Sequence, residues 1–305
     1  MLRLLFVFLT GLLSVSACTA KTPENPTQEK EYDQKIANSL LWKISGNGLS
    51  KPSYLFGTIH MICASDFVWT NAMQKAFGSA EKLCLEMDLD DPGLAMEAMM
   101  GMMATDGKQL KSYFTDAQWE KLKAFMKEQP GMGGIPLEMM QMMKPVMLLS
   151  MLSTKGVACD STLSYEMVLM EKAKAGEKEV LGLETAGEQL SALNTLPSDS
   201  VVAQIVAFLD GKDEEGSKEM NAMTKAYKTQ NLGLLDTLIN NSMSLGNTTS
   251  KGALLDDRNA NWISRMTEKM KPNSVFFGVG AGHLPGTKGV ITLLRKAGYK
   301  VEPLL

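Results

Sequence analysis

Short apolar runs alternate with stretches of helical spacing along most of this chain. Between the runs, apolar residues recur three or four positions apart, which predicts helices that each bury one face. The runs that we predict as strands are residues 40–44, 53–56, 82–89, 180–183, 274–279 and 299–301. Because these strands alternate with helices, the pattern predicts an α/β fold with a central, mostly parallel or mixed sheet.

The stretch from Pro92 to about Lys155 has helical spacing and is rich in methionine. We expect it to form a large helical insertion or lid over the sheet. Thioethers can bind soft Cu(I), but these methionines are spread over several helices and have no flanking histidine or cysteine. We therefore interpret them as adaptable packing that lines a core or a groove, a surface that also suits varied apolar peptide side chains.

The N-terminus has the pattern of a secretory leader, with Arg3 before an apolar run and small residues before Cys18. The form VSAC at residues 15–18 resembles the lipobox of bacterial lipoproteins; the alternative is an ordinary signal peptide that happens to contain a cysteine. We expect residues 1–17 to be a lipoprotein signal peptide, residues 18–38 a lipidated Cys18 with a polar tether, and residues 39–305 the folded domain. This organisation predicts lipid anchoring in the bacterial cell envelope, in the outer membrane or facing the periplasm.

Composition and charge narrow the possible partners. With 305 residues, of which 45% are hydrophobic, the chain can bury the core of one large domain or two small ones. The formal net charge is -3, and lysines are interleaved with acidic residues. The chain therefore lacks the basic patch of a nucleic-acid-binding protein, and we exclude that class.

The chain has four cysteines. If Cys18 carries lipid in an oxidising compartment, the remaining three imply one disulfide and one free thiol. Cys63 follows a histidine motif and Cys159 opens another motif segment, so we favour a bond between these two. Cys84 lies inside an apolar strand, where a free cysteine behaves as a small buried hydrophobe.

Both of the two histidines in the chain follow a glycine by three positions at the end of an apolar run: His60 in GTIH and His283 in GAGH. Both histidines could simply be polar residues in turns. Because both occur in the same G-x-x-H pattern, we favour a functional role for them, since glycine lets other groups approach the backbone closely. Glu86 closes a third apolar run. The carboxyl ends of parallel strands share one sheet edge, and two imidazoles with a carboxylate can hold a catalytic divalent metal.

These motifs in their order resemble the TraB/GumN family, which includes the Tiki membrane proteases and pheromone-shutdown proteins. The resemblance covers about residues 41–301 and is carried by KPSYLFGTIH, LEMDL, GVACD, EVLGLETAGEQL, LLDDRNANW and VGAGHLPGTKGV. It implies a metal-dependent peptidase whose activity needs His60, Glu86 and His283. Manganese, cobalt and zinc all suit such a set, and the Tiki members favour the first two. Other members are known only as pheromone inhibitors, so the resemblance by itself leaves catalysis open.

Two further residues are candidates for catalytic roles. Arg258, in the motif that matches the family's Arg-Asn pair, could hold a peptide carboxylate or stabilise an oxyanion; as a structural residue it could pair with Glu184 or Asp160. Glu184 directly precedes Thr185-Ala-Gly-Glu188, which has the form of a capping box. It therefore stands at a helix N-terminus, either as a general base or metal partner or as an ordinary helix-start charge.

The sequence supports three functional hypotheses. The first is a lipid-anchored, extracytoplasmic metallopeptidase that acts on peptides or exposed protein termini, with His60, Glu86 and His283 around the metal. A non-catalytic protein that sequesters a peptide or another ligand is the second. The third is a metal-free hydrolase with His60 or His283 as the base.

Overall fold

The computed structural model of the chain describes residues 36–129, 134–153, 159, 161–212, 214–242 and 248–305. All of these residues belong to one compact unit, Lys35–Leu305. Cys18 and Asp160, which the sequence analysis singled out, lie outside the described residues.

A six-stranded sheet forms the centre of this unit, with the strands in the order β6-β4-β7-β2-β1-β8. Strands β6, β4, β7 and β2 are parallel to one another, whereas β1 runs antiparallel to both β2 and β8. The predicted α/β class with a mostly parallel or mixed sheet is therefore confirmed. The strands are β1 (Leu41–Ser45), β2 (Ser53–Thr58), β4 (Lys82–Met87), β6 (Val180–Glu184), β7 (Val275–Gly280) and β8 (Lys300–Pro303).

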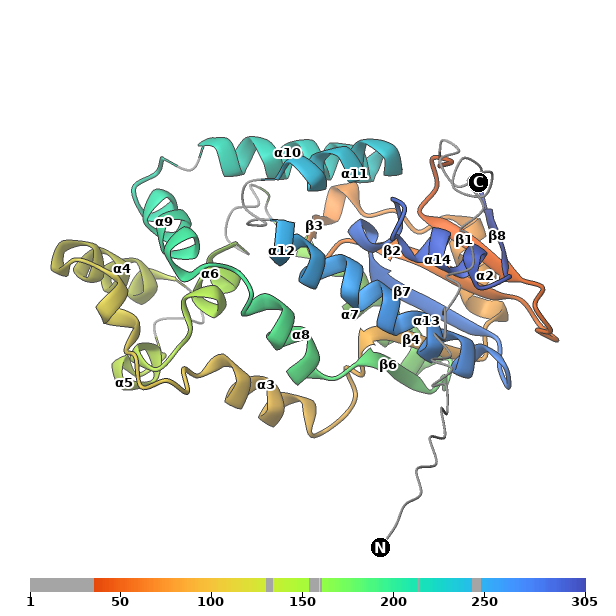
Figure 1. Ribbon diagram of the computed structural model, residues 1–305, viewed down its shortest axis with the longest axis horizontal. Coiled ribbons are helices and arrows are strands. Elements are labelled where there is room, and N and C mark those ends of the chain that lie inside the picture. Colours follow the sequence, from red (N-terminus) through yellow and green to blue (C-terminus); the bar gives the residue numbers. More distant parts are fainter. Residues whose placement is uncertain (1–35, 130–133, 154–158, 160, 213, 243–247) are drawn as a thin grey trace, which may run out of the picture. The chain divides into compact units, whose positions relative to one another are not determined.

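Helices cover both faces of the sheet (Figure 1). On one face lie α2 (Asn71–Ser79) and α7 (Tyr165–Ala175), where the Phe77 and Phe276 rings are 5.3 Å apart. On the other lie α13 (Asp257–Met270) and α14 (Val290–Lys296), where the Arg295 guanidinium stands 5.5 Å from the Trp42 ring. Strands buried on both faces have nearly continuous apolar sequences, which explains why they were recognisable as apolar runs.

A second buried apolar cluster lies among helices away from the sheet. It includes Leu122, Leu148 and Ile205, all fully buried. Its helices are α4 (Asp116–Glu128), α5 (Leu137–Gln141), α6 (Pro145–Ser153) and α9 (Ser198–Leu209). The methionine-rich segment thus folds as helices, as expected, but α9 joins it from beyond β6. Helix α8 (Ala186–Leu193) lies between this cluster and the sheet (Figure 1).

The packing interpretation of the methionines holds for only part of them. Met126, Met140, Met143 and Met147 are buried in the second cluster. Others are exposed to solvent and pack in no core: Met96, Met99, Met100, Met102 and Met142. Four of these five belong to α3 (Leu94–Met102), in which no residue is buried. For these five residues the predicted role in a core is wrong.

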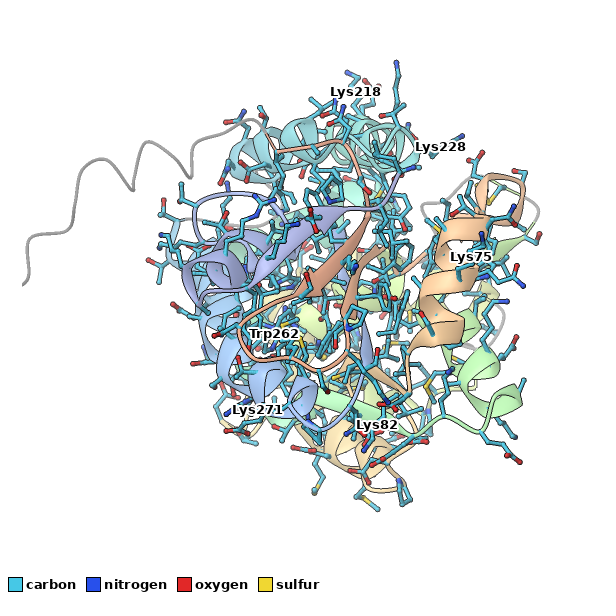
Figure 2. The ribbon with its side chains drawn as sticks, turned by 90° about the vertical axis from the view of Figure 1, so that its right-hand side faces the viewer. Lys75, Lys82, Lys218, Lys228, Trp262 and Lys271 are labelled. Carbon is cyan, nitrogen blue, oxygen red and sulfur yellow. A yellow bond between two sulfur atoms is a disulfide. The ribbon has the colours of Figure 1, made fainter. Side chains whose placement is uncertain are left out.

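The remaining elements are short or lie at the periphery. They are α10 (Glu214–Lys228), α11 (Leu232–Asn241), α12 (Thr248–Lys251), the π-helical turn η3 (Gly252–Asp256), and the short helices η1 (Ala64–Asp66), η2 (Leu110–Tyr113) and η4 (Ala281–His283). Lys218 and Lys228 of α10 lie at the outer edge in Figure 2, whereas Trp262 lies among the strands and helices. In the described part of the chain, no single helix is long and apolar enough to cross a membrane; the bent pair α8 and α9 meets that test only by length and composition.

Substitution by alanine should have opposite effects on stability at two glycines, one in a helix and one directly before a helix. A Cβ at Gly289, before α14, would stand 2.0 Å from the Pro285 carbonyl oxygen, whereas nothing lies within 4 Å of one at Gly78 in α2. We expect Gly289→Ala to lower the free energy of unfolding by about 2 to 3 kcal/mol because backbone must shift. Gly78→Ala should raise it by about 0.5 to 1 kcal/mol. Urea denaturation measures both, and equal effects would contradict the contacts at Gly289.

Candidate active site

The carboxyl ends of four neighbouring parallel strands bring the candidate residues to one edge of the sheet. Glu184 is the last residue of β6, and Glu86 is next to last in β4. His283 follows β7 by three residues, and His60 follows β2 by two. Because these strands are adjacent in the order β6-β4-β7-β2, they present Glu184, Glu86, His283 and His60 as a row.

The Arg258 guanidinium lies among three of these groups. Its Nη2 donates to Glu86 Oε2 at 2.6 Å and to Glu184 Oε1 at 2.5 Å. Its Nη1 donates to His283 Nε2 at 3.1 Å. Although burial disfavours the charge, the bonds and ion pairs with Glu184 and Glu86 raise the pKa of Arg258 above its ordinary value. Arg258 therefore contacts the candidate site itself, rather than pairing with Glu184 alone.

Glu86 is a buried carboxylate held in its ionised form. Burial alone would raise its pKa, but the neighbouring His283, Arg258 and His60 and a hydrogen bond from the Gly280 N–H lower the pKa of Glu86 to about 2. The Gly280 N–H donates to Glu86 Oε1 at 2.8 Å. A backbone donor at the end of the adjacent strand thus fixes this carboxylate toward the site.

His283 is buried and has one defined tautomer. The Asn259 side-chain nitrogen donates to the Lys288 carbonyl at 3.0 Å, so Asn259 Oδ1 is left to accept from His283 Nδ1 at 2.7 Å. His283 Nε2 therefore carries a lone pair, and it lies 3.8 Å from Glu86 Oε1. Burial lowers the pKa of His283 to about 3, so the ring is neutral near pH 7.

His60 has a different environment from His283. Its Nδ1 is 3.0 Å from Glu166 Oε1, and its side chain is 76% exposed. Glu166 also accepts from the Thr58 hydroxyl at 2.6 Å and from the Ser164 hydroxyl at 2.7 Å. The hydrogen bond to Glu166 raises the pKa of His60 to about 9, an effect that solvent screens in part because the ring is exposed.

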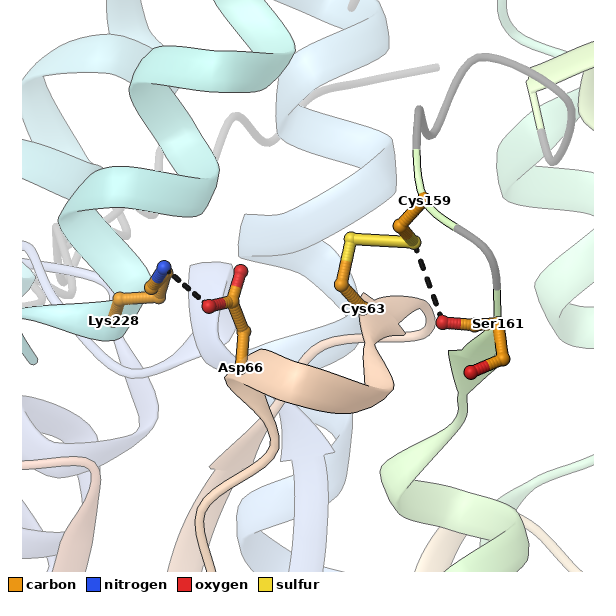
Figure 3. Close-up of a disulfide and its surroundings, with 5 residues drawn as sticks. All are labelled: Cys63, Asp66, Cys159, Ser161 and Lys228. Atoms are coloured by element: carbon orange, nitrogen blue, oxygen red, sulfur yellow. Dashed lines mark hydrogen bonds and ion pairs between the residues drawn. A yellow bond between two sulfur atoms is a disulfide. The ribbon is translucent and has the colours of Figure 1, made fainter.

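A small two-stranded sheet supports the His60–Glu166 pair. Strand β3 (Ile62–Cys63) follows His60, and β5 (Thr162–Leu163) precedes Glu166; the two strands are antiparallel. Cys63 and Cys159 form a disulfide beside them, with their Cα atoms 5.9 Å apart (Figure 3). Cys84 is free and buried. The sequence analysis favoured this pair, and the bond ties the segment after His60 to the segment before Glu166.

Two of the three expected metal ligands lie together. The structure brings Glu86 to His283, whereas His60 makes its contact with Glu166. In the described residues, no group of three or more histidine, cysteine, aspartate or glutamate side chains is placed to hold a metal ion. This arrangement differs from the expected meeting of three donors, because His60 is bonded to Glu166 and the Arg258 guanidinium bonds both Glu86 and His283.

The chemistry of the donors nevertheless fits a metal site. In both histidines Nδ1 is bonded to a side-chain oxygen, of Asn259 in one case and of Glu166 in the other. In metal-binding histidines, the ring nitrogen that does not face the metal characteristically donates such a hydrogen bond. Glu86 adds an ionised carboxylate, which is a suitable third donor. The residues therefore fit a divalent ion by donor type, with Arg258 as a competing cation.

Several residues of this site were not recognised from the sequence as functional. Trp262 donates to Glu184 Oε2 at 3.1 Å, and Gln189 donates to Glu86 and Glu184 at 3.1 and 3.2 Å. Glu166 was missed altogether, since nothing in its helical context marks it. The capping box at Thr185 was recognisable and is confirmed; it starts α8 and so carries Gln189 back over the two carboxylates.

A cavity lies beside the cluster, between α8 and the start of α13. Its volume is about 580 Å³, and Glu184 and Arg258 line one side of it. Glu188, Asp257 and Arg265 make the other walls charged. Through Glu184 and Arg258 the cavity borders the buried cluster.

Comparison with known proteins identifies the family. The model of the TraB/PrgY/gumN family matches residues 40–303, most of the chain. The chain belongs to the TraB/PrgY/gumN family. The matched region contains every residue of the site described above, so the site belongs to the family domain.

The relatives of this family member include proteins named as metalloproteases. Metalloprotease TIKI1 of Danio rerio is 25% identical over 336 residues, covering 94% of this chain and 65% of the relative. Metalloprotease TIKI2 of Danio rerio is 24% identical, with 90% and 62% covered, and a metalloprotease TIKI homolog of Amphimedon queenslandica is 24% identical, with 88% and 62% covered. The chain thus spans less than two thirds of the length of these relatives. No solved structure matches it.

The contacts of Arg258 predict a large stability effect. Arg258→Met would leave Glu86 and Glu184 buried without their cationic partner, so we expect the free energy of unfolding to fall by about 3 to 5 kcal/mol. Arg265→Met, two turns later on α13, is the matched control, because Arg265 pairs with Glu188 at 35% and 43% side-chain exposure. That change should cost about 1 kcal/mol or less. Guanidinium chloride denaturation compares the two, and a similar loss in both variants would contradict a special role for Arg258.

Proposed function

We propose that this chain is a metal-dependent peptidase of the bacterial cell envelope that hydrolyses peptide bonds in peptides or exposed protein termini. The observation that carries the proposal is the row of Glu184, Glu86, His283 and His60 at the ends of four adjacent parallel strands. Membership of a family whose relatives are named metalloproteases supports the same class of reaction.

The residues of the site would have different roles in catalysis, set by their charge and protonation state. Neutral His283 has a lone pair on Nε2, which accepts from Arg258 Nη1, and Glu86 offers an ionised carboxylate 3.8 Å away; both side chains are in the protonation state that a metal ion requires of its ligands. Arg258 has N–H donors in a fixed fork, which suits a peptide carbonyl oxygen as negative charge develops on it. Glu184 and Trp262 hold that fork in place, since both are bonded in the same cluster.

His60, Glu86 and His283 would hold the metal, with Asn259 and Glu166 fixing the two rings. A divalent manganese, cobalt or zinc ion bound there would supply Lewis-acid polarisation of the scissile carbonyl. Since Arg258 bonds Glu86 and His283 directly, ion binding requires this guanidinium to give up one or both contacts.

A second candidate function is the capture of a peptide without cleavage. It is favoured by the pairing of Arg258 with two carboxylates, which engages the donors of its guanidinium and leaves one net negative charge in the cluster. A cavity of about 580 Å³ with charged lining residues lies beside it. Such a cavity can hold a polar segment of chain without any reaction.

The peptidase proposal predicts cleavage that depends on the buried pair. We expect the full-length protein to cleave members of a peptide library, followed by mass spectrometry, and a chelator to stop the cleavage until manganese, cobalt or zinc is restored. His283→Ala and Glu86→Gln should each lower kcat/KM by about 10²-fold or more, because each removes a donor of the proposed metal site. Titration calorimetry should show weaker binding of the metal in both variants.

Asp210→Asn is the control, because Asp210 is half exposed, pairs with Lys121 and takes no part in the site. Cleavage that survives both site substitutions would overturn the proposal. Peptides that bind but remain uncut would favour the capture function, and cleavage that a chelator leaves unchanged would favour a metal-free hydrolase.

The proposal includes a lipid anchor at Cys18, supported by the VSAC form and the polar tether that follows it. If Cys18 receives the lipid, Cys18→Ala should release the protein from the membrane fraction or block removal of the leader. Fractionation and metabolic labelling with a palmitate analogue measure both effects. A variant that is labelled and partitions like the wild type would show that the anchor assignment is wrong.

A further inference from the structure

Helix α3 presents its methionines to solvent and packs with its other side. On the packed side, Glu97 accepts a hydrogen bond of 3.0 Å from the Gly187 N–H, and a Cβ at Gly101 would come within 2.1 Å of Leu190. Both contacts are with α8. The opposite side carries Met96, Met99, Met100 and Met102, which are 57%, 43%, 61% and 37% exposed. This is the reverse of an ordinary amphipathic helix, whose apolar side faces the core.

A fifth exposed methionine comes from the end of α5. The residue after α3, Met103, forms an antiparallel bridge with Met143. The Ala104 N–H donates to the Met142 carbonyl at 2.6 Å, and the Lys144 N–H donates to the Met102 carbonyl at 3.0 Å. These bonds fix the end of α3 against the end of α5 and place Met142, 51% exposed, close to Met102 at the end of α3.

We name Met96, Met99, Met100, Met102 and Met142 the thioether patch. Its chemistry is specific, because seven of the twelve large exposed hydrophobic side chains in the described residues are methionine and five of these seven gather here. A surface that only needed to be apolar could use leucine, which forms helices as well as methionine does. What methionine adds is a polarizable sulfur, a ligand that selects soft cations such as Cu(I).

We propose that the thioether patch is a binding site for a soft monovalent cation, Cu(I) or its analogue Ag(I). Two short segments supply the sulfurs, one from α3 and one from the end of α5, and the backbone bridge between them holds their spacing. The metal is bound and released in one oxidation state, so no electron donor or acceptor is involved. This site uses none of the residues of the candidate active site and does not depend on peptidase activity.

Thioether ligation has a signature that separates it from other metal sites. A thioether has no proton to lose in the physiological range, whereas imidazole and carboxylate ligands must be deprotonated before they bind. The affinity of the patch for Ag(I) should therefore be the same at pH 5.5 and at pH 8. Binding through histidines or carboxylates would instead weaken as the pH falls.

The test compares full-length wild-type protein with a variant in which all five patch methionines are changed to leucine. Leucine keeps the apolar surface and the helix propensity but removes the sulfur. A partner that binds the patch only through apolar contacts should therefore bind the variant as well. Met167→Leu with Met220→Leu is the control, because these methionines are 58% and 45% exposed on other helices. Buried Cys84, whose pKa burial raises to about 12, is present in all three proteins and cannot account for a difference between them.

Silver is added to protein labelled with ¹³C at the methionine methyl groups, and single Met→Leu variants assign the resonances. We expect the five patch methyls to shift in the wild type and in the control, and the affinity to fall about tenfold or more in the patch variant, with unchanged circular dichroism. Equal affinity in the patch variant, or shifts confined to other methionines, would overturn the proposal. Wild-type protein that does not bind Ag(I) but binds an apolar peptide would also overturn the proposal and would indicate a docking surface instead.

Discussion

The buried charge cluster around Arg258 constrains the rest of the structure. Two carboxylates, Glu86 and Glu184, are almost inaccessible to solvent, and one guanidinium bonds both of them. Charges cost several kcal/mol to bury unless partners compensate them. The sheet edge, helix α13 and helix α8 must therefore stay in register, since each of them supplies a member of the cluster or a side chain that bonds to it.

The strand order makes this cluster possible. Parallel strands β6, β4, β7 and β2 end at the same edge, so residues far apart in the sequence become neighbours without any long loop reaching across the sheet. Strand β1, which is antiparallel to β2, and strand β8 lie beyond β2 and contribute none of the described contacts at the site. The candidate site is thus confined to the ends of the four parallel strands, while β1 and β8 complete the core.

The two histidines show how environment separates residues that share a motif. His283 sits in the turn η4 beneath α13, with the Trp262 ring 4.4 Å away, and burial keeps it neutral. His60 extends past β2 into solvent and pairs with Glu166, which favours its protonated form. The two rings therefore carry different charges near neutral pH, a division that proteins obtain by placing like groups in unlike surroundings.

The sequence by itself determined the strands, the α/β class and the main candidates at the site, because apolar runs that stop at glycine or at an acid are local signals. His60, Glu86, Glu184 and His283 were recognisable in this way, whereas Arg258 was recognised only by its match to the family's Arg-Asn motif. The roles of Glu166, Asn259, Gln189 and Trp262 were decided only by the tertiary structure, since each acts on a partner brought near by packing. The same limit applies to the methionines. Helical spacing predicts which of them share a face of α3, but only the packing of α3 on α8 determines that this face is exposed to solvent.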